Sequence, residues 1–297
     1  HKITATALAQ EAGIYREGHE VLTGEEIEAM SDTLLSQRLD AVSVFARVTP
    51  NHKLRIIQAY KRRGEVIAMT GDGINDAPSL VAADLGVAMG RIGTDVAKEA
   101  SDIILLDDNF STIVAAIEEG RSIYKTIKKV IIYLFSNSLG EVLTITGALI
   151  IGLPLPILGA QILWLNLVTD GFLDITLAME PKEKGLLSGT FGHPNKYLVD
   201  SLMVRRMFVM ALPMMVGSLF LFNEYYRDDL AKAMTITLTA LAVFQWFNVW
   251  NCRSEDRSIF TMNFFSNMYL VGATLIVISL QIMAVYAPFM HTILRTV

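Results

Sequence analysis

Residues 65–78 read EVIAMTGDGINDAP, and this stretch decides the fold of the first part of the chain. It predicts a short buried strand over 65–69 that runs into a turn with two glycines, which let the backbone turn tightly and approach a ligand. Asp72 and Asp76 place two carboxylates on that turn, and hard oxygen ligands of this kind suit Mg²⁺ bound together with a phosphate. Pro78 falls early in the next helix, where its missing N–H costs little.

The same order of elements extends on both sides of this stretch. Short apolar runs predict strands over 41–46, 86–89 and 102–106, and apolar residues at helical spacing predict a helix over 51–61. Strands that alternate with helices indicate an α/β domain with a parallel sheet. Ligands of such sheets gather beyond the carboxyl ends of the strands, which is where the two aspartates are expected.

Composition separates this region from the rest of the chain. Residues 1–129 hold 15 Lys/Arg and 19 Asp/Glu, whereas residues 130–297 hold only 10 and 11. The whole chain is 52% hydrophobic and 19% charged, whereas a soluble domain usually carries about 25% charged residues. We therefore expect a soluble part followed by a membrane part. No basic stripe suggests a nucleic-acid partner, and a single cysteine excludes a disulfide framework.

Five apolar stretches in the second part approach the roughly 20 residues that cross a bilayer. They predict membrane-spanning helices at about 130–151, 156–179, 207–223, 233–252 and 267–288. The boundary is expected between a soluble domain, 1–125, and a transmembrane domain, 126–297. Loops on the side of the soluble domain carry seven Lys/Arg, including Lys184 and Lys196, against three on the other side. This asymmetry agrees with the positive-inside rule.

Three carboxylates fall inside the predicted spans, where ionisable groups are costly and usually mark an ion path. Glu141 lies on the first span, and Asn137 and Ser138 lie four and three residues before it. One face of the second span is predicted to carry Asn166, Thr169, Asp170 and Asp174. Two such helices facing each other offer all-oxygen coordination, which suits a hard cation such as Ca²⁺.

Several strings resemble the P-type cation-transporting ATPases, in particular their calcium-pump branch. TGDGINDAP at 70–78 is similar to the hinge-and-magnesium motif of that family, and ARVTPNHK at 46–53 is similar to a segment that precedes it. GTDVAKEASD at 93–102, LDDNF at 106–110 and NLVTDG at 166–171 also agree in order and spacing. The resemblance covers essentially the whole chain. It implies part of a haloacid-dehalogenase-like α/β phosphorylation domain, followed by an α-helical multi-pass transmembrane domain.

The resemblance implies roles for five residues of the soluble domain. Asp72 would bind Mg²⁺, and Asp76 would support that metal or its water shell. Asn75 would hydrogen-bond the transferring phosphate, Lys53 would neutralise its charge, and Arg47 would lie near the phosphates or ribose of ATP. Such roles belong to phosphoryl transfer, in which positioning and charge neutralisation do most of the work.

The resemblance also implies cation ligands in the membrane domain, namely Glu141, Asn166, Thr169 and Asp170. Further candidate ligands are Asn137, Ser138, Asp174 and Gln245. Ser138 stands where reticulum-type calcium pumps have Asn, and Gln245 stands where they have Glu, so the ion stays open. Asp174 is an added carboxylate whose role as ligand, proton carrier or paired polar group also stays open. Two carboxylates buried so close favour proton counter-transport as a hypothesis.

Taken together, the resemblance implies part of an ATP-driven cation pump that uses Mg²⁺ and ATP, with Ca²⁺ as the first expectation and Na⁺/K⁺ or H⁺ as the alternative. Its partners would be the cation, the lipid bilayer, and the actuator domain, nucleotide-binding domain and first four membrane segments of the same protein. The family's phosphorylated-aspartate motif is missing, so the chain alone is expected to be inactive. A multi-pass location in the plasma membrane of a prokaryote is expected.

Two other functions rank lower. A lipid flippase of the same superfamily would lack the dense carboxylate cluster of the predicted spans. A non-catalytic membrane protein with a decayed ATPase domain is disfavoured because Lys53, Asp72 and Asp76 are all intact.

Overall fold

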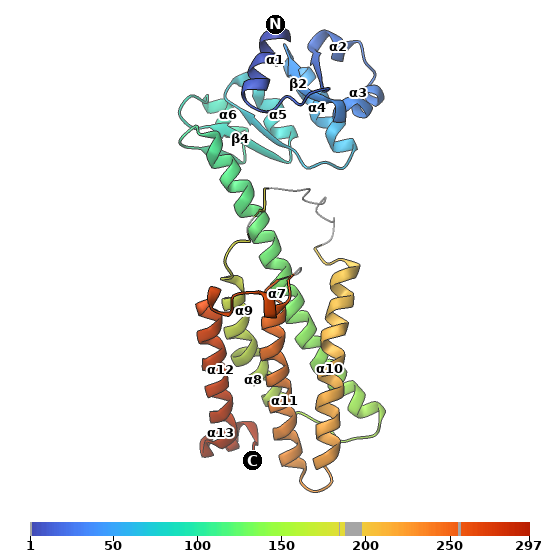
Figure 1. Cartoon of the computed structure of the whole chain (residues 1–297), viewed down its shortest axis with the longest axis vertical. Helices are drawn as coiled ribbons and strands as arrows, with labels where there is room; N and C mark the ends of the chain where they lie inside the picture. The colour runs from blue at the N-terminus through green and yellow to red at the C-terminus, as the bar shows by residue number, and fades with distance from the viewer. Residues whose placement is uncertain (1, 184, 188–197, 255–256) are drawn as a thin grey trace. The chain divides into compact units, whose positions relative to one another are not determined.

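The computed structural model describes residues 2–183, 185–187, 198–254 and 257–297. Lys184 and Lys196 of the charge comparison lie outside the described residues. Contacts divide the chain into two compact units, His1–Ala116 and Ile117–Val297 (Figure 1). This division falls before the predicted boundary at residue 125, inside the long helix α7 (Phe110–Ile150).

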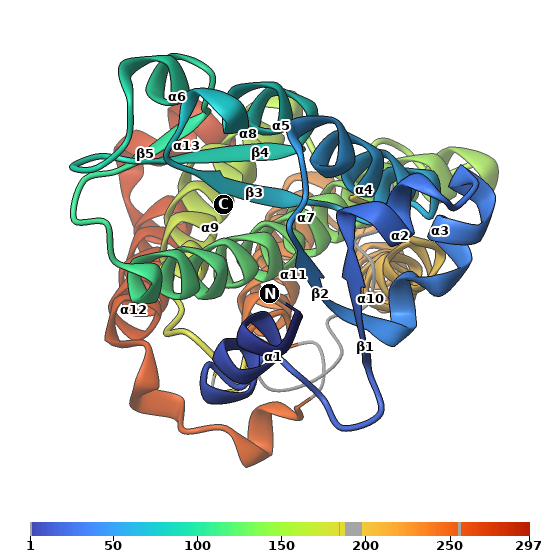
Figure 2. The ribbon, with the colours of Figure 1, turned by 90° about the horizontal axis from the view of Figure 1, so that it is seen from above.

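The first unit alternates parallel strands with short helices, which confirms the predicted α/β fold. Strands β1 (Glu20–Thr23) and β2 (Val42–Ala46) form one parallel pair. A second parallel sheet has the order β3 (Ala68–Gly71), β4 (Leu85–Met89) and β5 (Ile103–Leu105) (Figure 2). The helices are α1 (Lys2–Glu11), α2 (Gly24–Glu28), α3 (Asp32–Arg38), α4 (Pro50–Arg62), α5 (Ala77–Ala82) and α6 (Asp95–Glu99).

The strand expected over 65–69 begins later, at Ala68, and reaches Gly71. Asp84 explains the shift, because its side chain accepts from the Ile67 N–H at 3.0 Å while the Ile67 carbonyl accepts from the Asp84 N–H. These bonds use both backbone polar groups of Ile67, and regular pairing with β4 starts at the next residue, Ala68. The strand therefore ends directly at the glycine-containing turn.

The second unit is helical. Its elements are the rest of α7, α8 (Gly159–Trp164), a π-helix (Leu165–Asp170), α9 (Gly171–Ala178), α10 (Ser201–Tyr225), α11 (Leu230–Asn251), α12 (Met268–Tyr286) and α13 (Pro288–Leu294). Within the described residues, α7, α10, α11 and α12 are each long and apolar enough to cross a membrane. The predicted span 156–179 is instead built from three consecutive segments, so the arrangement of five spans stays a prediction.

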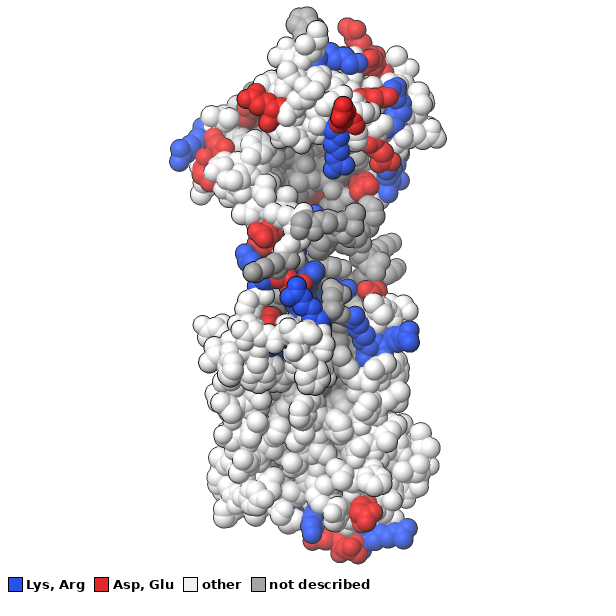
Figure 3. All heavy atoms as spheres, viewed as in Figure 1, with Lys and Arg blue, Asp and Glu red and all other residues white. Residues whose placement is uncertain are grey.

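Charge is unevenly distributed over the second unit. On the face shown in Figure 3, charged side chains gather at its two ends, and the surface between them carries none. Large apolar side chains such as Phe135, Leu163, Phe220 and Leu275 are exposed on its helices. Contiguous exposed apolar surface of this kind fits contact with lipid, which shares the apolar character of these side chains.

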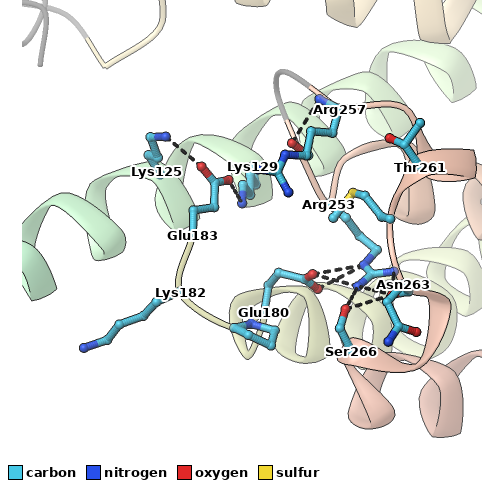
Figure 4. Close-up of a pocket in the computed structure, with 13 residues that line it drawn as sticks. Lys125, Lys129, Glu180, Lys182, Glu183, Arg253, Arg257, Thr261, Asn263 and Ser266 are labelled. Carbon is cyan, nitrogen blue, oxygen red and sulfur yellow. Dashed lines mark hydrogen bonds and ion pairs between the residues drawn. The ribbon is translucent and has the colours of Figure 1, made fainter. Parts of the chain in front are cut away.

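Ion pairs tie the loop that follows α9 to α7 (Figure 4). Glu183 accepts from Lys125 and from Lys129, each at 2.7 Å. Nearby, the fully buried Arg253 guanidinium pairs with Glu180 at 2.8 Å. These groups line a polar hollow of about 710 Å³ at one end of the helices of this unit. The loop is therefore held by charge at its start.

Candidate functional site

The turn after β3 is compact because Gly71 has no side chain. A Cβ at this position would lie 2.5 Å from the Cβ of Asp76. Without that clash, the chain passes through a 3₁₀ turn, Ile74–Asp76, and enters α5 with Pro78 in its first turn, as predicted. Asp76 is thereby folded back over the end of the strand, with 8% of its surface exposed.

The carboxylate of Asp76 is fully engaged within the protein. Its Oδ1 accepts from Lys53 Nζ, and its Oδ2 accepts from the backbone N–H groups of Asp72 and Gly73 at 3.3 and 3.2 Å. Burial raises the pKa of Asp76, but the hydrogen bonds from Lys53 and Gly73 outweigh it, so the pKa lies below its ordinary value. The carboxylate is charged at neutral pH and holds the turn to the lysine.

Lys53 reaches Asp76 because α4 starts at a defined point. Thr49 caps this helix: its Oγ1 accepts from the His52 N–H at 3.4 Å, and His52 Nδ1 accepts from the Thr49 N–H at 3.2 Å. The other ring nitrogen of His52 bonds Glu28 at 2.8 Å. These contacts of His52 and Glu28 were not predicted from the sequence. Thr49-Pro50 marks the helix start, with His52 in the place that Glu or Gln usually takes in a capping box.

Three predicted residues of this unit are exposed. They are Asp72, Asn75 and Arg47. None of these side chains makes a hydrogen bond or ion pair with a described residue. The Asp72 backbone is nevertheless fixed, because its carbonyl accepts from the Thr94 N–H at 2.8 Å. An exposed, uncommitted carboxylate on a fixed backbone fits a direct Mg²⁺ ligand, whereas the engaged carboxylate of Asp76 fits a supporting role.

A second carboxylate of this unit shapes a neighbouring loop. Asp108 accepts from the backbone N–H groups of Gly90, Arg91 and Ile92 at 2.6, 3.0 and 2.9 Å. Burial raises the pKa of Asp108, but these backbone hydrogen bonds hold it below its ordinary value. Asp108 belongs to the LDDNF string, and no role was predicted for it from the sequence. In the structure it fixes the loop that follows β4.

Two buried carboxylates lie at the centre of the second unit. Glu141 of α7 and Asp170 of the π-helix are 5% and 3% exposed. Gln245 of α11 is fully buried, and its Nε2 donates to Glu141 Oε1 at 2.9 Å. Its own carbonyl oxygen is buried and has no hydrogen-bond partner among the described residues. A buried, unpaired oxygen next to the Glu141 carboxylate is a candidate cation ligand.

Asp170 is held by two donors from α7. Its Oδ1 accepts from the Tyr133 hydroxyl at 2.7 Å and from Asn137 Nδ2 at 2.9 Å. Both donors are fully buried. Tyr133 was not predicted from the sequence. It lies about two helical turns before Glu141, so the helical spacing could have identified it.

The structure distinguishes the two polar residues before Glu141. Asn137 is fully buried and joins the site, whereas Ser138 is exposed. On the second predicted span, Thr169 is buried with 2% of its surface exposed. Asn166 is exposed, although its amide interacts with the Glu141 carboxylate.

Asp174 lies outside this set. It is partly exposed, and its carboxylate accepts from the adjacent Ile175 N–H at 2.6 Å. The π-helix explains why the four polar residues of this span do not share one face, because its wider turns shift the phase between Asn166 and Asp174. Within the described part of the chain, no three His, Cys, Asp or Glu side chains lie close enough to hold a metal ion. The site therefore consists of two carboxylates and neutral oxygens.

Together, the two units define a membrane protein that joins a haloacid-dehalogenase-like α/β unit to a helical bundle with a polar centre. Residues 1–84 match the family of haloacid dehalogenase-like hydrolases. Residues 154–297 match the family described as cation transporting ATPase, C-terminus. The first match contains Lys53 and the glycine-containing turn, and the second contains Asp170 and Gln245.

Curated relatives match along the whole chain. A calcium-transporting ATPase of Bacillus subtilis is 40% identical over 100% of this chain and 34% of its own length. A probable cation-transporting ATPase F of Mycobacterium bovis is 40% identical over 100% and 33%. The calcium-transporting ATPase type 2C member 1 of Homo sapiens is 38% identical over 99% and 32%. The chain belongs to the P-type cation-transporting ATPases, and it spans about one third of the length of these relatives.

Proposed function

We propose that the chain forms the ion-binding and magnesium-binding portion of an ATP-driven cation pump, and that the transported ion is Ca²⁺. The observation that carries the proposal is the buried pair of Glu141 and Asp170, with the orphaned oxygen of Gln245 beside it. Burying two carboxylates without a cation is costly, and a divalent ion matches their charge. Relatives named as calcium-transporting ATPases support the same ion.

The α/β unit would supply the phosphoryl-transfer chemistry. When bound, Mg²⁺ would neutralise the charge of the transferring phosphate, and Asp72 is the residue that would hold it. Lys53 and Asp76 are already paired, so they set the shape of the turn before any ligand binds. Asn75 and Arg47 are exposed and would contact the phosphate and ATP. The phosphorylated aspartate, the actuator domain, the nucleotide-binding domain and the first four membrane segments would come from the rest of the protein.

Gln245 supports an alternative, transport of Na⁺/K⁺ or H⁺. Gln245 is neutral, so the site carries less negative charge than a third carboxylate would give, which suits Na⁺/K⁺ or H⁺ transport. Asp174 is a candidate proton carrier in that case, because it is accessible while Glu141 and Asp170 are not. We assign the protein to the plasma membrane of a prokaryote, which the relatives from Bacillus and Mycobacterium support.

The test is ATP-dependent ⁴⁵Ca²⁺ uptake by the complete protein in sealed vesicles. Glu141→Gln and Asp170→Asn should each reduce uptake at least about tenfold, because each removes a charged oxygen from a buried site. Ser138→Ala is the matched control on the same helix, and because Ser138 is exposed it should transport normally. ATPase activity stimulated by Na⁺, K⁺ or pH, without Ca²⁺ uptake, would keep the pump and replace the ion. Full uptake by both carboxylate variants would contradict the site.

A further inference from the structure

A chain of buried hydrogen bonds runs from α11 to the carboxylate of Asp170. Asn248 Nδ2 donates to Ser136 Oγ and to Asn137 Oδ1, both at 2.7 Å. Asn137 Nδ2 then donates to Asp170 Oδ1 at 2.9 Å. These four residues are at most 4% exposed, so water does not compete for these bonds. Asn248 is therefore linked to Asp170 although the two side chains are not themselves hydrogen-bonded.

One backbone carbonyl determines which group is the donor and which is the acceptor in each of these hydrogen bonds. The Ser136 hydroxyl donates to the Tyr133 carbonyl at 2.9 Å, and a carbonyl can only accept. Since the single hydroxyl hydrogen of Ser136 is used there, its oxygen must accept from the amide NH₂ of Asn248. The same NH₂ also donates to Asn137, so the side-chain oxygen of Asn137 must face Asn248. The NH₂ of Asn137 is then the group that faces Asp170.

This orientation decides how Asn137 and Asp170 can act. The oxygen of Asn137 is occupied by Asn248, so it is turned away from the two carboxylates. Asp170 Oδ1 already has two donors, the Tyr133 hydroxyl and the Asn137 amide. Its Oδ2 accepts no hydrogen bond from any described residue. The oxygen that Asp170 can offer to a cation is thus Oδ2.

We propose that Asn248 is a positioning residue of the cation site, which acts through Asn137 to hold Asp170 with one carboxylate oxygen facing the transported cation. Asn137 is a hydrogen-bond donor in this arrangement and not a cation ligand. The inference rests on the proposed function, since it concerns the same site. A carboxylate held in place before the cation arrives loses little freedom on binding, which favours affinity.

The experiment measures ATPase activity of the purified complete protein against free Ca²⁺ concentration. Asn248→Leu keeps the approximate volume of the side chain and removes its amide. The half-saturating Ca²⁺ concentration should rise about tenfold, because the hydrogen-bond chain to a charged group is broken, while the maximal rate stays within about twofold. Asn248→Ser, which is too short to bridge Ser136 and Asn137, gives the same readout if the leucine variant fails to fold.

Gln281→Leu is the matched control. Gln281 is also a buried amide between helices, and it accepts from Trp164 Nε1 at 3.0 Å and donates to Thr239 Oγ1 at 3.3 Å, away from the two carboxylates. This variant should lower the melting temperature as Asn248→Leu does, but it should leave the half-saturating concentration unchanged. An Asn248 variant that behaves like Gln281→Leu in both measurements would overturn the inference.

The variant Asn137→Asp tests whether Asn137 acts as a hydrogen-bond donor to Asp170 or as a cation ligand. A ligand replaced by a carboxylate would bind Ca²⁺ more tightly, whereas a lost donor places a second carboxylate against Asp170, and the half-saturating concentration should rise. Tighter Ca²⁺ binding would therefore overturn the inference.

The variant Glu141→Gln tests the proposed function separately from the inference about Asn248. If it abolishes Ca²⁺ stimulation while the Asn248 variants are unaffected, only the inference fails. If Glu141→Gln has no effect, the proposed cation site itself fails.

Discussion

At the scale of single residues, the α/β unit separates two neighbouring carboxylates by what surrounds them. Asp76 is buried and bonded to Lys53 and two backbone N–H groups, while Asp72 is exposed on a fixed backbone. Two aspartates four residues apart therefore differ in exposure and in hydrogen bonding. The difference originates at Gly71, whose missing side chain lets Asp76 fold back.

Gly71→Ala should break this arrangement. The new Cβ would lie 2.5 Å from the Cβ of Asp76, and overpacking of this kind costs about 1–3 kcal/mol. We expect a lower melting temperature and reduced ATPase activity, measured on the complete protein. Gly73→Ala is the matched control on the same turn, because its nearest contact would be at 3.8 Å. Equal stability of the two variants would show that Gly71 is not required by the turn.

At the scale of elements, α7 and the π-helix place the membrane site. α7 has 41 residues, roughly 60 Å of helix, which is about twice the thickness of a hydrocarbon core. One helix therefore carries both the lysines of the polar hollow and the buried Glu141. The π-helix brings Thr169 and Asp170 inward while leaving Asp174 partly exposed. The helix widens over Leu165–Asp170 and continues from Gly171 as α9.

The ion pairs of Glu183 should make the loop after α9 sensitive to acid. Burial raises the pKa of Glu183, but the hydrogen bonds from Lys125 and Lys129 hold it below the usual 4.5. A lowered pKa stabilises the folded loop above pH 4.5, and this stabilisation is lost as the pH falls further through the pKa of the folded state. Protection of the Glu180, Lys182 and Glu183 amides against hydrogen exchange, taken relative to an unstructured peptide at the same pH, should therefore be high at neutral pH and fall below pH 4.5.

Glu183→Gln should show the acid behaviour already at neutral pH, because the amide carries no charge for the two lysines. Glu224→Gln is the control, since Glu224 is exposed and has no ion pair with a described residue. Exchange of the loop that is as slow in Glu183→Gln as in the unmodified protein would mean that packing, not charge, holds it.

At the scale of the whole molecule, the question is how many times the chain crosses the membrane. The described helices include four that are long and apolar enough, and the segment of α8, π-helix and α9 would be a fifth crossing. This segment is helical without a break from Gly159 to Ala178, and its hydrogen-bond pattern changes at the π-helix within it. Its buried Asp170 places it inside the bundle.

Cysteine labelling in sealed vesicles tests the five-span prediction. The background is Cys252→Ser, which removes the single native cysteine. Leu155→Cys and Leu187→Cys place thiols at exposed positions on either side of the segment. A membrane-impermeant thiol reagent should label them from opposite sides, and Asp228→Cys should label from the same side as Leu155→Cys. Labelling of positions 155 and 187 from one side would reduce the count to four spans.

Local patterns determined much of this protein. Alternating apolar runs and helical spacing predicted the α/β unit, because secondary structure depends on neighbours a few residues away. Long apolar stretches predicted the membrane helices, and the cost of burying charge directed attention to Glu141 and Asp170. The glycine-containing turn after β3 was also predicted, because its two glycines allow the backbone to turn tightly.

Only the tertiary structure decided which side chains meet. Spacing allowed both Asn137 and Ser138 to face Glu141, and packing against α11 buried the first and exposed the second. The π-helix changed the phase of the second span, which a regular helical pattern could not predict. Asn248 joined Asp170 through Asn137 because α7, α11 and the π-helix pack together. Contacts between residues far apart in the chain depend on three-dimensional packing, which periodicity along the sequence does not record.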